Sequence, residues 1–235
     1  MKLALVMLTM AAACCVVVPS MAAVRAAPGG PSLDLDIAYY TRVTTPEGVT
    51  REARYKEAML RRPGHVWVER ILPAPAPAVD RAAVSGGAVG HAEFNHAIAP
   101  HHVTWEKNAA RIDFVDTREK AVVAIPAAEY GNVNFDGSWT NAYFLLDPKR
   151  VSAMPRSDRK SPVVGARWRE QEKNGVFERV LWDENRQIPL TIESGDKAAT
   201  FYRRVDVSVR PSLSARLPWL QLNGYAQKEF SDYLD

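Results

Sequence analysis

The chain contains only two cysteines, Cys14 and Cys15, and both lie in an apolar stretch at the amino terminus. Removal of that stretch on export would leave a protein without any thiol. Disulfides, thiolate metal sites, c-type haem attachment and a cysteine nucleophile are then all excluded, even in a compartment that permits disulfides. The packed core alone must then stabilise the fold.

The sequence also lacks the short motifs that accompany common catalytic sites. It contains no Gly-x-Ser-x-Gly elbow, no His-Glu-x-x-His pair and no phosphate-binding loop. The glycines of segment 86–90 do not have the spacing of a dinucleotide site. A Ser-His-Asp triad built from distant residues stays open, because such triads are defined by geometry. We therefore expect a non-catalytic protein.

Charge of one sign and long hydrophobic runs are scarce as well. The 30 Lys and Arg residues nearly balance the 27 Asp and Glu residues, and the charges are spread along the chain. A nucleic-acid partner is not expected on this basis. After the amino-terminal stretch, no segment has the roughly 20 apolar residues that a membrane-spanning helix needs.

The amino terminus has the three-part pattern of a secretory signal. Lys2 supplies the positive charge, an apolar run extends from Leu3 to Val18, and Ser20-Met21-Ala22 fits the cleavage motif. Residues 1–22 are therefore predicted to be a signal peptide cleaved near Ala22. Such a signal places the protein in the bacterial periplasm.

This cleavage has three alternatives. A membrane anchor would need a longer apolar run than this one. Lipid attachment at Cys14 would need a Leu-like residue at position 11 and a polar segment afterwards, whereas Ala11 and Cys15-Val16 stand there. Cleavage after Val24-Arg25-Ala26 is a later option for the same signal.

The chain after the signal is predicted to form one domain. Residues 23–32 resemble a flexible leader, and residues 33–235 are expected to be a single β-rich domain with a Pro/Ala/Gly-rich loop at 73–90. From Leu33 to Tyr39 apolar residues alternate with polar ones, which indicates a half-buried strand. The Thr45-Pro46-Glu47-Gly48 segment predicts a turn into a second strand.

The second half of the chain predicts a meander of four strands over 163–210. Asn174-Gly175 is a strong hairpin signal, and Ser194-Gly195-Asp196 indicates another turn. Pro189 indicates that its strand lies at an edge or begins there.

Two helices complete the expected architecture. One follows Ser138 and ends at Asp147-Pro148, and an amphipathic helix covers Leu217 to Leu234. The predicted fold is therefore mainly β, an open curved antiparallel sheet or half-barrel of about ten strands with two or three helices, including a C-terminal helix. A closed barrel is the alternative.

Four of the five histidines fall within twelve residues: His91, His96, His101 and His102. Imidazole is a common ligand of Cu and Zn, so the cluster is a candidate metal site. The spacing limits how many of these histidines can bind one ion. Residues five apart, such as His91 and His96, do not share a helical face, and successive strand residues, such as His101 and His102, point to opposite faces. At most three of the four are expected to converge; the alternative is a set of solvated loop histidines.

Two further groups are candidate binding residues. Asp34 and Asp36 share one face of a strand and could hold a cation, although this pattern is also typical of the solvated face of an edge strand. Four aromatic residues could line an apolar ligand pocket between helices and sheet, although such residues often belong to the core: Tyr130, Trp139, Tyr143 and Phe144.

The strands from Val163 through Trp182-Asp183, then Ile188 to Glu193 and on to Val209, resemble the later strands of LolA/RseB-type envelope proteins. That family has an open, strongly curved antiparallel sheet with helices on its concave side. The resemblance implies an apolar concavity for acyl chains or lipopeptides, and it assigns no individual residue. The family usually begins with a helix, whereas this chain is predicted to begin with strands.

The sequence is compatible with three functions. The first is a periplasmic, non-catalytic binding or accessory protein that holds an apolar ligand or a protein partner on the curved sheet. The second is a periplasmic protein that handles Cu, Zn or haem iron with His91, His96 and one of His101 or His102. The third is a metal-dependent hydrolase on the same histidines, with Glu93 as its base.

Overall fold

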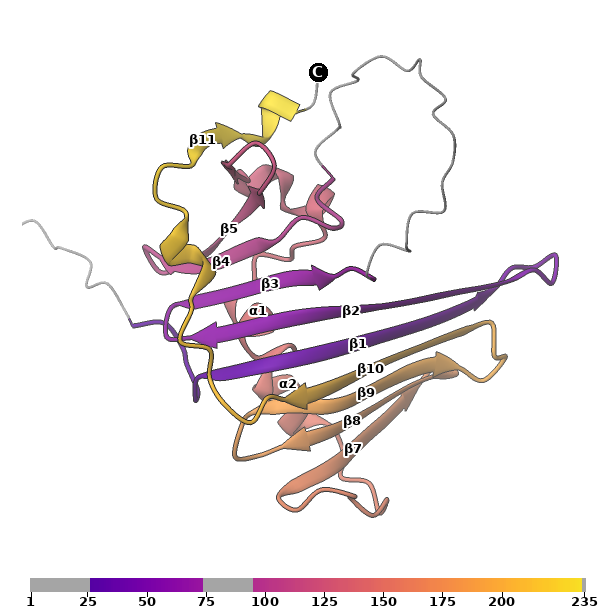
Figure 1. Ribbon diagram of the computed structural model, residues 1–235. Coiled ribbons are helices and arrows are strands. Elements are labelled where there is room, and N and C mark those ends of the chain that lie inside the picture. Colours follow the sequence, from indigo (N-terminus) through magenta and orange to yellow (C-terminus); the bar gives the residue numbers. More distant parts are fainter. Residues whose placement is uncertain (1–25, 74–94, 234–235) are drawn as a thin grey trace, which may run out of the picture.

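The computed structural model describes residues 26–73 and 95–233. They form one open sheet of 11 strands in the order β11-β6-β5-β4-β3-β2-β1-β10-β9-β8-β7 (Figure 1). The expected open, mainly antiparallel sheet is thus confirmed, and β11 against β6 is its parallel pair. The strands are β1 Leu33–Thr44, β2 Thr50–Arg62, β3 His65–Ile71, β4 His101–Glu106, β5 Ala109–Asp116, β6 Ala121–Ala124, β7 Ala166–Lys173, β8 Val176–Asp183, β9 Ile188–Asp196, β10 Phe201–Val209 and β11 Ala226–Glu229.

Three short helices follow β6 in the chain: the 3₁₀ helix η1 Ala127–Val133 and the α-helices α1 Trp139–Phe144 and α2 Pro148–Ala153. The hydroxyl of Ser138 accepts a hydrogen bond from the Asn141 amide, as the predicted cap requires. Asp147 was expected to end this helix. Instead it caps α2, because its carboxylate accepts from the Lys149 amide and Pro148 fits the first helical turn.

The sheet has two different faces because side chains alternate along each strand. The helix face carries the main core: Leu35 and Ile37 of β1 are buried there against α1 and α2. The opposite face, here the tail face, is partly covered by the carboxyl-terminal segment, where Trp219 packs on a cluster that includes Leu60 and Trp67. Figure 1 shows the two short helices on one side of the sheet and the tail crossing the other.

The first strand lies in the middle of the sheet, not at an edge. β1 pairs with β2 on one side and with β10 on the other. Its acidic residues are therefore not a solvated edge pattern: Asp34 is buried, lies 2.7 Å from the Arg62 guanidinium and accepts from the Ser214 amide. Asp36 pairs with Arg210 at 2.6 Å. On the tail face, Asp34 thus binds the segment that contains Ser214, and Asp36 binds Arg210 just after β10.

The β7–β10 meander forms as predicted, with one turn in a different place. Asn174 and Gly175 both have positive φ, as a tight hairpin requires. The turn expected at 194–196 is wrong, because β9 continues to Asp196 and the chain turns only afterwards. Gly195 serves close packing instead, since a Cβ there would lie 2.8 Å from the Phe201 carbonyl oxygen.

Pro189 lies near the start of β9, a strand between β8 and β10. The register of β8 against β9 shifts between Leu181 and Trp182, just where Trp182 faces Pro189. The β9–β10 pairing covers only Thr191 onward on β9, so this proline lies outside that ladder. The strand therefore begins at the proline, which is one of the two expected placements.

The expected amphipathic helix at 217–234 is replaced by two 3₁₀ turns, η2 Pro218–Gln221 and η3 Phe230–Tyr233, with β11 between them. Gly224 takes φ of +84° and interrupts any continuous helix. The free edge of β6 offers backbone partners to β11 instead, and Leu220, expected on the apolar face, is 70% exposed.

Parts of the predicted organisation lie outside the described residues: the signal peptide, the start of the leader, most of the 73–90 loop, His91 and Glu93. The carbonyls at the end of the leader accept hydrogen bonds, from Trp139 to Pro28 and from Tyr143 to Gly30. Within the described residues, none of the helices combines the length and apolar character needed to cross a membrane.

Candidate functional site

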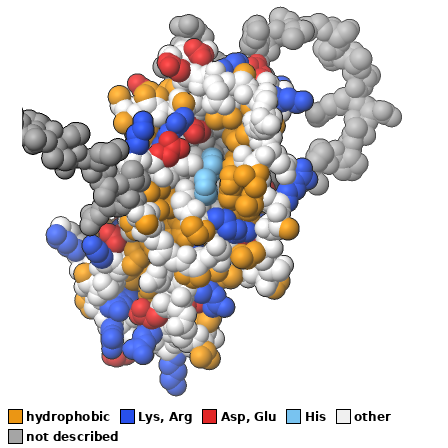
Figure 2. Space-filling view, turned by 90° about the vertical axis from the view of Figure 1, so that its left-hand side faces the viewer, with side chains coloured by type: hydrophobic (Ala, Val, Ile, Leu, Met, Phe, Trp, Pro, Cys, Tyr) orange, Lys and Arg blue, Asp and Glu red, His pale blue; other side chains and the backbone are white. Residues whose placement is uncertain are grey.

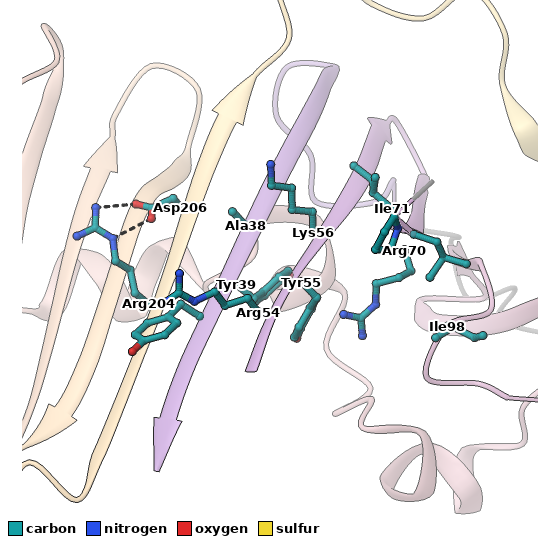
Figure 3. A pocket seen from close by; sticks show the side chains of 13 residues that line it. Ala38, Tyr39, Arg54, Tyr55, Lys56, Arg70, Ile71, Ile98, Arg204 and Asp206 are labelled. Atoms are coloured by element: carbon teal, nitrogen blue, oxygen red, sulfur yellow. Dashed lines mark hydrogen bonds and ion pairs between the residues drawn. The ribbon is translucent and has the colours of Figure 1, made fainter. Parts of the chain in front are cut away.

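A hollow of about 760 Å³ lies where β3 ends beside β2. β3 pairs with β2 only from Lys56 to Arg62, so the earlier part of β2 has no strand beside it on that side within the described chain. Residues of both sheet faces reach this gap. Figure 3 shows the lining side chains projecting from β10, β1, β2 and the end of β3.

Apolar side chains form one wall of this hollow. Ile71, Leu72 and Ile98 are 42%, 59% and 46% exposed, although large apolar side chains are usually buried. Ala38 lies on the floor, in register with Lys56 on β2 and Asp206 on β10, and its small side chain leaves the space above it open. Exposed apolar residues that gather around a hollow are typical of a binding surface.

Cationic groups form the opposite wall. Lys56 is exposed and makes no ion pair with any residue in the described ranges. Arg54 lies over the Tyr40 ring and contacts Glu52 at 3.2 Å. Arg204 is held by Asp206 at 2.8 Å, and the hydrogen bond from this guanidinium to Asp206 raises the pKa of Arg204.

Arg70 stands between this hollow and a second one. Its guanidinium carbon lies 3.5 Å from the centre of the Tyr55 ring, and its Nη2 donates to the Ala97 carbonyl at 3.2 Å. Both Arg70 and Tyr55 also line a cavity of about 590 Å³ between the sheet and the helices. The Arg70 Nε is buried and makes no hydrogen bond, and it lies 3.9 Å from a carboxylate oxygen of Glu57.

Glu57 and Asp136 are the acidic residues that line the helix-face cavity. Burial raises the pKa of Glu57 above its usual value, and a hydrogen bond from Tyr39 together with nearby positive charge opposes this rise. Glu57 lies 3.9 Å from Arg70, a weak ion pair. Tyr39 stacks on Tyr55 with ring centres 4.4 Å apart, so the two tyrosines and the Glu57 carboxylate form one polar group at this cavity.

The four predicted pocket aromatics lie beside the cavity rather than in its lining. Trp139, Tyr143 and Phe144 are buried in the main core with relative exposures of 3%, 0% and 5%. Tyr130 is half-buried, and its hydroxyl donates to the Ala110 carbonyl. Around these helices the cavity is lined instead by Asn141 and Ala142 of α1 and by Phe135, Leu145 and Leu146, which follow η1 and α1 in the chain.

The described histidines are divided between the two faces. His96 and His101 line the helix-face cavity, where both rings contact Phe114. His102 points to the tail face, as expected for the next residue of a strand, and meets His65 there. Burial lowers the pKa of His101 and of His102 to about 4, so both imidazoles are neutral at pH 7.

Within the described ranges, no three His, Cys, Asp or Glu side chains form a group suited to a metal ion. His91 and Glu93 lie outside those ranges, so the metal site and the hydrolase predicted on the histidine cluster stay predictions. His65 was not part of the predicted cluster, because it lies 37 residues before His102 and reaches it only through the β3–β4 pairing.

No family model and no curated protein matches this chain. Three solved structures are similar to it at low identity. PNGF-II matches at 8% identity over 86% of this chain and 32% of its own, with a TM-score of 0.35. A putative outer membrane lipoprotein-sorting protein domain from Vibrio parahaemolyticus matches at 11% identity over 77% of this chain and 87% of its own, with a TM-score of 0.30. A DUF1329 family protein from Desulfovibrio piger ATCC 29098 matches at 11% identity over 78% of this chain and 88% of its own, with a TM-score of 0.27.

This chain spans about a third of the PNGF-II chain. All three TM-scores are below 0.5, so no conclusion about function follows from these likenesses.

Proposed function

We propose that this protein is an exported, periplasmic binding protein without catalytic activity, and that it holds an amphipathic anion in the hollow at the end of β3. The ligand's apolar chain would lie against Ile71, Leu72 and Ile98. Its acidic head would face Lys56 and Arg70.

The observation that carries this proposal is the pairing of an exposed apolar wall with an unpaired cation in one hollow. The volume of about 760 Å³ is within the range of small-molecule sites, roughly 300–1,000 Å³. An acidic head would supply a counter-charge to Lys56, which makes no ion pair within the described ranges. An acidic amphiphile satisfies both walls.

The test is a titration of the mature protein with a fluorescent long-chain carboxylate, dansyl-undecanoate. We expect saturable binding of one probe per chain and a blue-shifted emission. Leu72→Asp and Ile98→Asp should each weaken binding at least tenfold. Val176→Asp is the matched control, because Val176 is 49% exposed on β8, away from the hollow, and this variant should bind like the wild type.

Equal weakening in all three variants, or no saturable binding, would contradict the proposed ligand. Saturable binding of a protein from the envelope at the same residues, without probe binding, would favour a protein partner instead. Export is tested separately by mass spectrometry of the native protein. A periplasmic product that starts after Ala22 supports it, and a cytosolic product with Met1 intact contradicts it.

A further inference from the structure

Two imidazoles meet edge to edge on the tail face. Nδ1 of His65 lies 3.1 Å from Nε2 of His102, and the two rings are within 13° of parallel. His65 belongs to β3 and His102 to β4, and the register pairs Trp67 with His102, so the histidines are diagonal neighbours across the ladder. The sheet therefore fixes both rings from rigid strands.

Trp219 of the tail covers this pair. Its ring centre lies 5.2 Å from that of His65 and 5.3 Å from that of His102, with interplanar angles of 10° and 13°. The two imidazole centres are themselves 5.2 Å apart. Three nearly parallel rings at equal separations cannot form a column, so the imidazoles lie side by side in one layer beneath the indole.

The two nitrogens face each other in their ring planes, and one carries the proton that the other accepts. A metal ion can replace this proton when both rings turn so that their lone pairs meet beside the line that joins the nitrogens. With metal–nitrogen bonds of about 2.0–2.1 Å, a tetrahedral ion holds its two nitrogens about 3.3 Å apart. The observed distance of 3.1 Å needs a change of only a few tenths of an ångström.

We propose that His65 and His102 bind one imidazole-preferring transition-metal ion of the Cu²⁺ or Zn²⁺ class. Among the described residues no third His, Cys, Asp or Glu completes the set, so water fills the remaining positions. The site is distinct from the predicted cluster, since it uses His65 and places His96 on the other face. It does not depend on the proposed ligand hollow.

The surroundings suit a cation that can be exchanged. His65 is half-buried, and Figure 2 shows histidine reaching the surface between hydrophobic and charged side chains. Glu106, whose carboxylate accepts a hydrogen bond from Thr104 on the same face, adds negative charge near His65. The indole face of Trp219 favours positive charge above the pair.

The test is a titration of tag-free mature protein with Cu²⁺, followed by calorimetry and by tryptophan fluorescence. We expect one ion per chain at micromolar concentration, with quenching that falls in Trp219→Phe while binding persists. His65→Gln and His102→Gln should each weaken binding at least tenfold. His96→Gln is the matched control and should bind like the wild type.

The electron paramagnetic resonance spectrum of the Cu²⁺ complex should show coupling to two imidazole nitrogens, a readout that does not depend on any variant. A wild type that binds no ion at micromolar concentration would overturn the proposal. Unchanged binding in folded His65→Gln, or coupling to a single nitrogen, would overturn it as well. A loss in His96→Gln that matches the other two variants would assign the metal to the loop histidines and reject this site.

Discussion

Arg70 lies flat against Tyr55, with 3.5 Å between the guanidinium carbon and the ring centre, and this pair separates the two hollows of the molecule. A guanidinium stacked on an aromatic ring keeps its edge donors available to another group. One of them, Nε, makes no hydrogen bond and lies 3.9 Å from the Glu57 carboxylate, a distance at which the ion pair is weak. The Arg70–Tyr55 pair therefore divides the two hollows, and the Arg70 guanidinium is a candidate contact for a bound anion.

Replacing Arg70 by Ala should weaken binding of the dansyl-undecanoate carboxylate about tenfold, since a charge-assisted hydrogen bond contributes roughly 1.5 kcal/mol. Arg70→Lys should recover part of this loss, because it keeps the charge but not the stacked geometry. Fluorescence titration of both variants measures the effect. Arg51→Ala is the control, because Arg51 is exposed on β2 and lines neither hollow; an equal loss there would contradict a role for Arg70.

Filling the floor of the hollow should block binding without unfolding the protein. Ala38→Trp places a large ring where only a methyl group now lies, so probe affinity should fall at least fivefold. Thermal unfolding should change little, because substitutions of residues that are not in the packed core are usually within about 0.5 kcal/mol. The control is Ala53→Trp on the exposed part of β2, which should bind normally. Normal binding by Ala38→Trp would place the ligand elsewhere.

Local patterns in the sequence predicted most strands. The alternation from Leu33, the hairpin signal at Asn174-Gly175 and the strand over 176–183 all have local causes, and the structure confirms them. The tail was the main error, because a helical spacing of apolar residues did not reveal that Gly224 and the free edge of β6 favour a strand.

The candidate site was much less predictable. The hollow exists because β3 stops opposite Lys56 while β2 continues, and the length of one strand relative to its neighbour has no local signal. The His65–His102 pair likewise depends on the β3–β4 register. In the sequence Ile71 and Leu72 stand directly before the proline-rich segment, but only the structure shows that both side chains are exposed.

Arg61 is predicted to contribute strongly to the stability of the fold, although its side chain is charged. It is fully buried, its guanidinium donates to the carbonyls of Pro31, Tyr143 and Arg186, and it stacks on the Tyr143 ring. Burial lowers the pKa of Arg61 to about 10, so it stays charged at pH 7.

Arg61→Met should therefore lower the free energy of unfolding by about 3 kcal/mol or more, because several buried carbonyls lose their donor. Urea denaturation at pH 7 measures this. Arg54→Met, at an exposed position of the same strand, should change stability by less than about 0.5 kcal/mol. Similar effects in the two variants would show that the Arg61 contacts contribute little.

Glu57 should make the protein less stable as the pH rises from about 4.5. Burial raises the pKa of Glu57 in the folded protein above its ordinary value of 4.5, so between these two values the folded state binds more protons than the unfolded state. Stability therefore falls with increasing pH across that window, and the loss remains at pH 7. Glu57→Gln removes this contribution, since its amide does not ionise.

Urea denaturation of the wild type and Glu57→Gln at pH 4 and pH 7 tests this relation. The difference in unfolding free energy between variant and wild type should shift in favour of the variant at pH 7 relative to pH 4. Glu52→Gln, exposed on the same strand, should show a smaller change between the two pH values. A difference that moves toward the wild type at pH 7 would mean that Arg70 and the other nearby positive charge outweigh burial, and that the carboxylate stabilises the cavity in its ionised form.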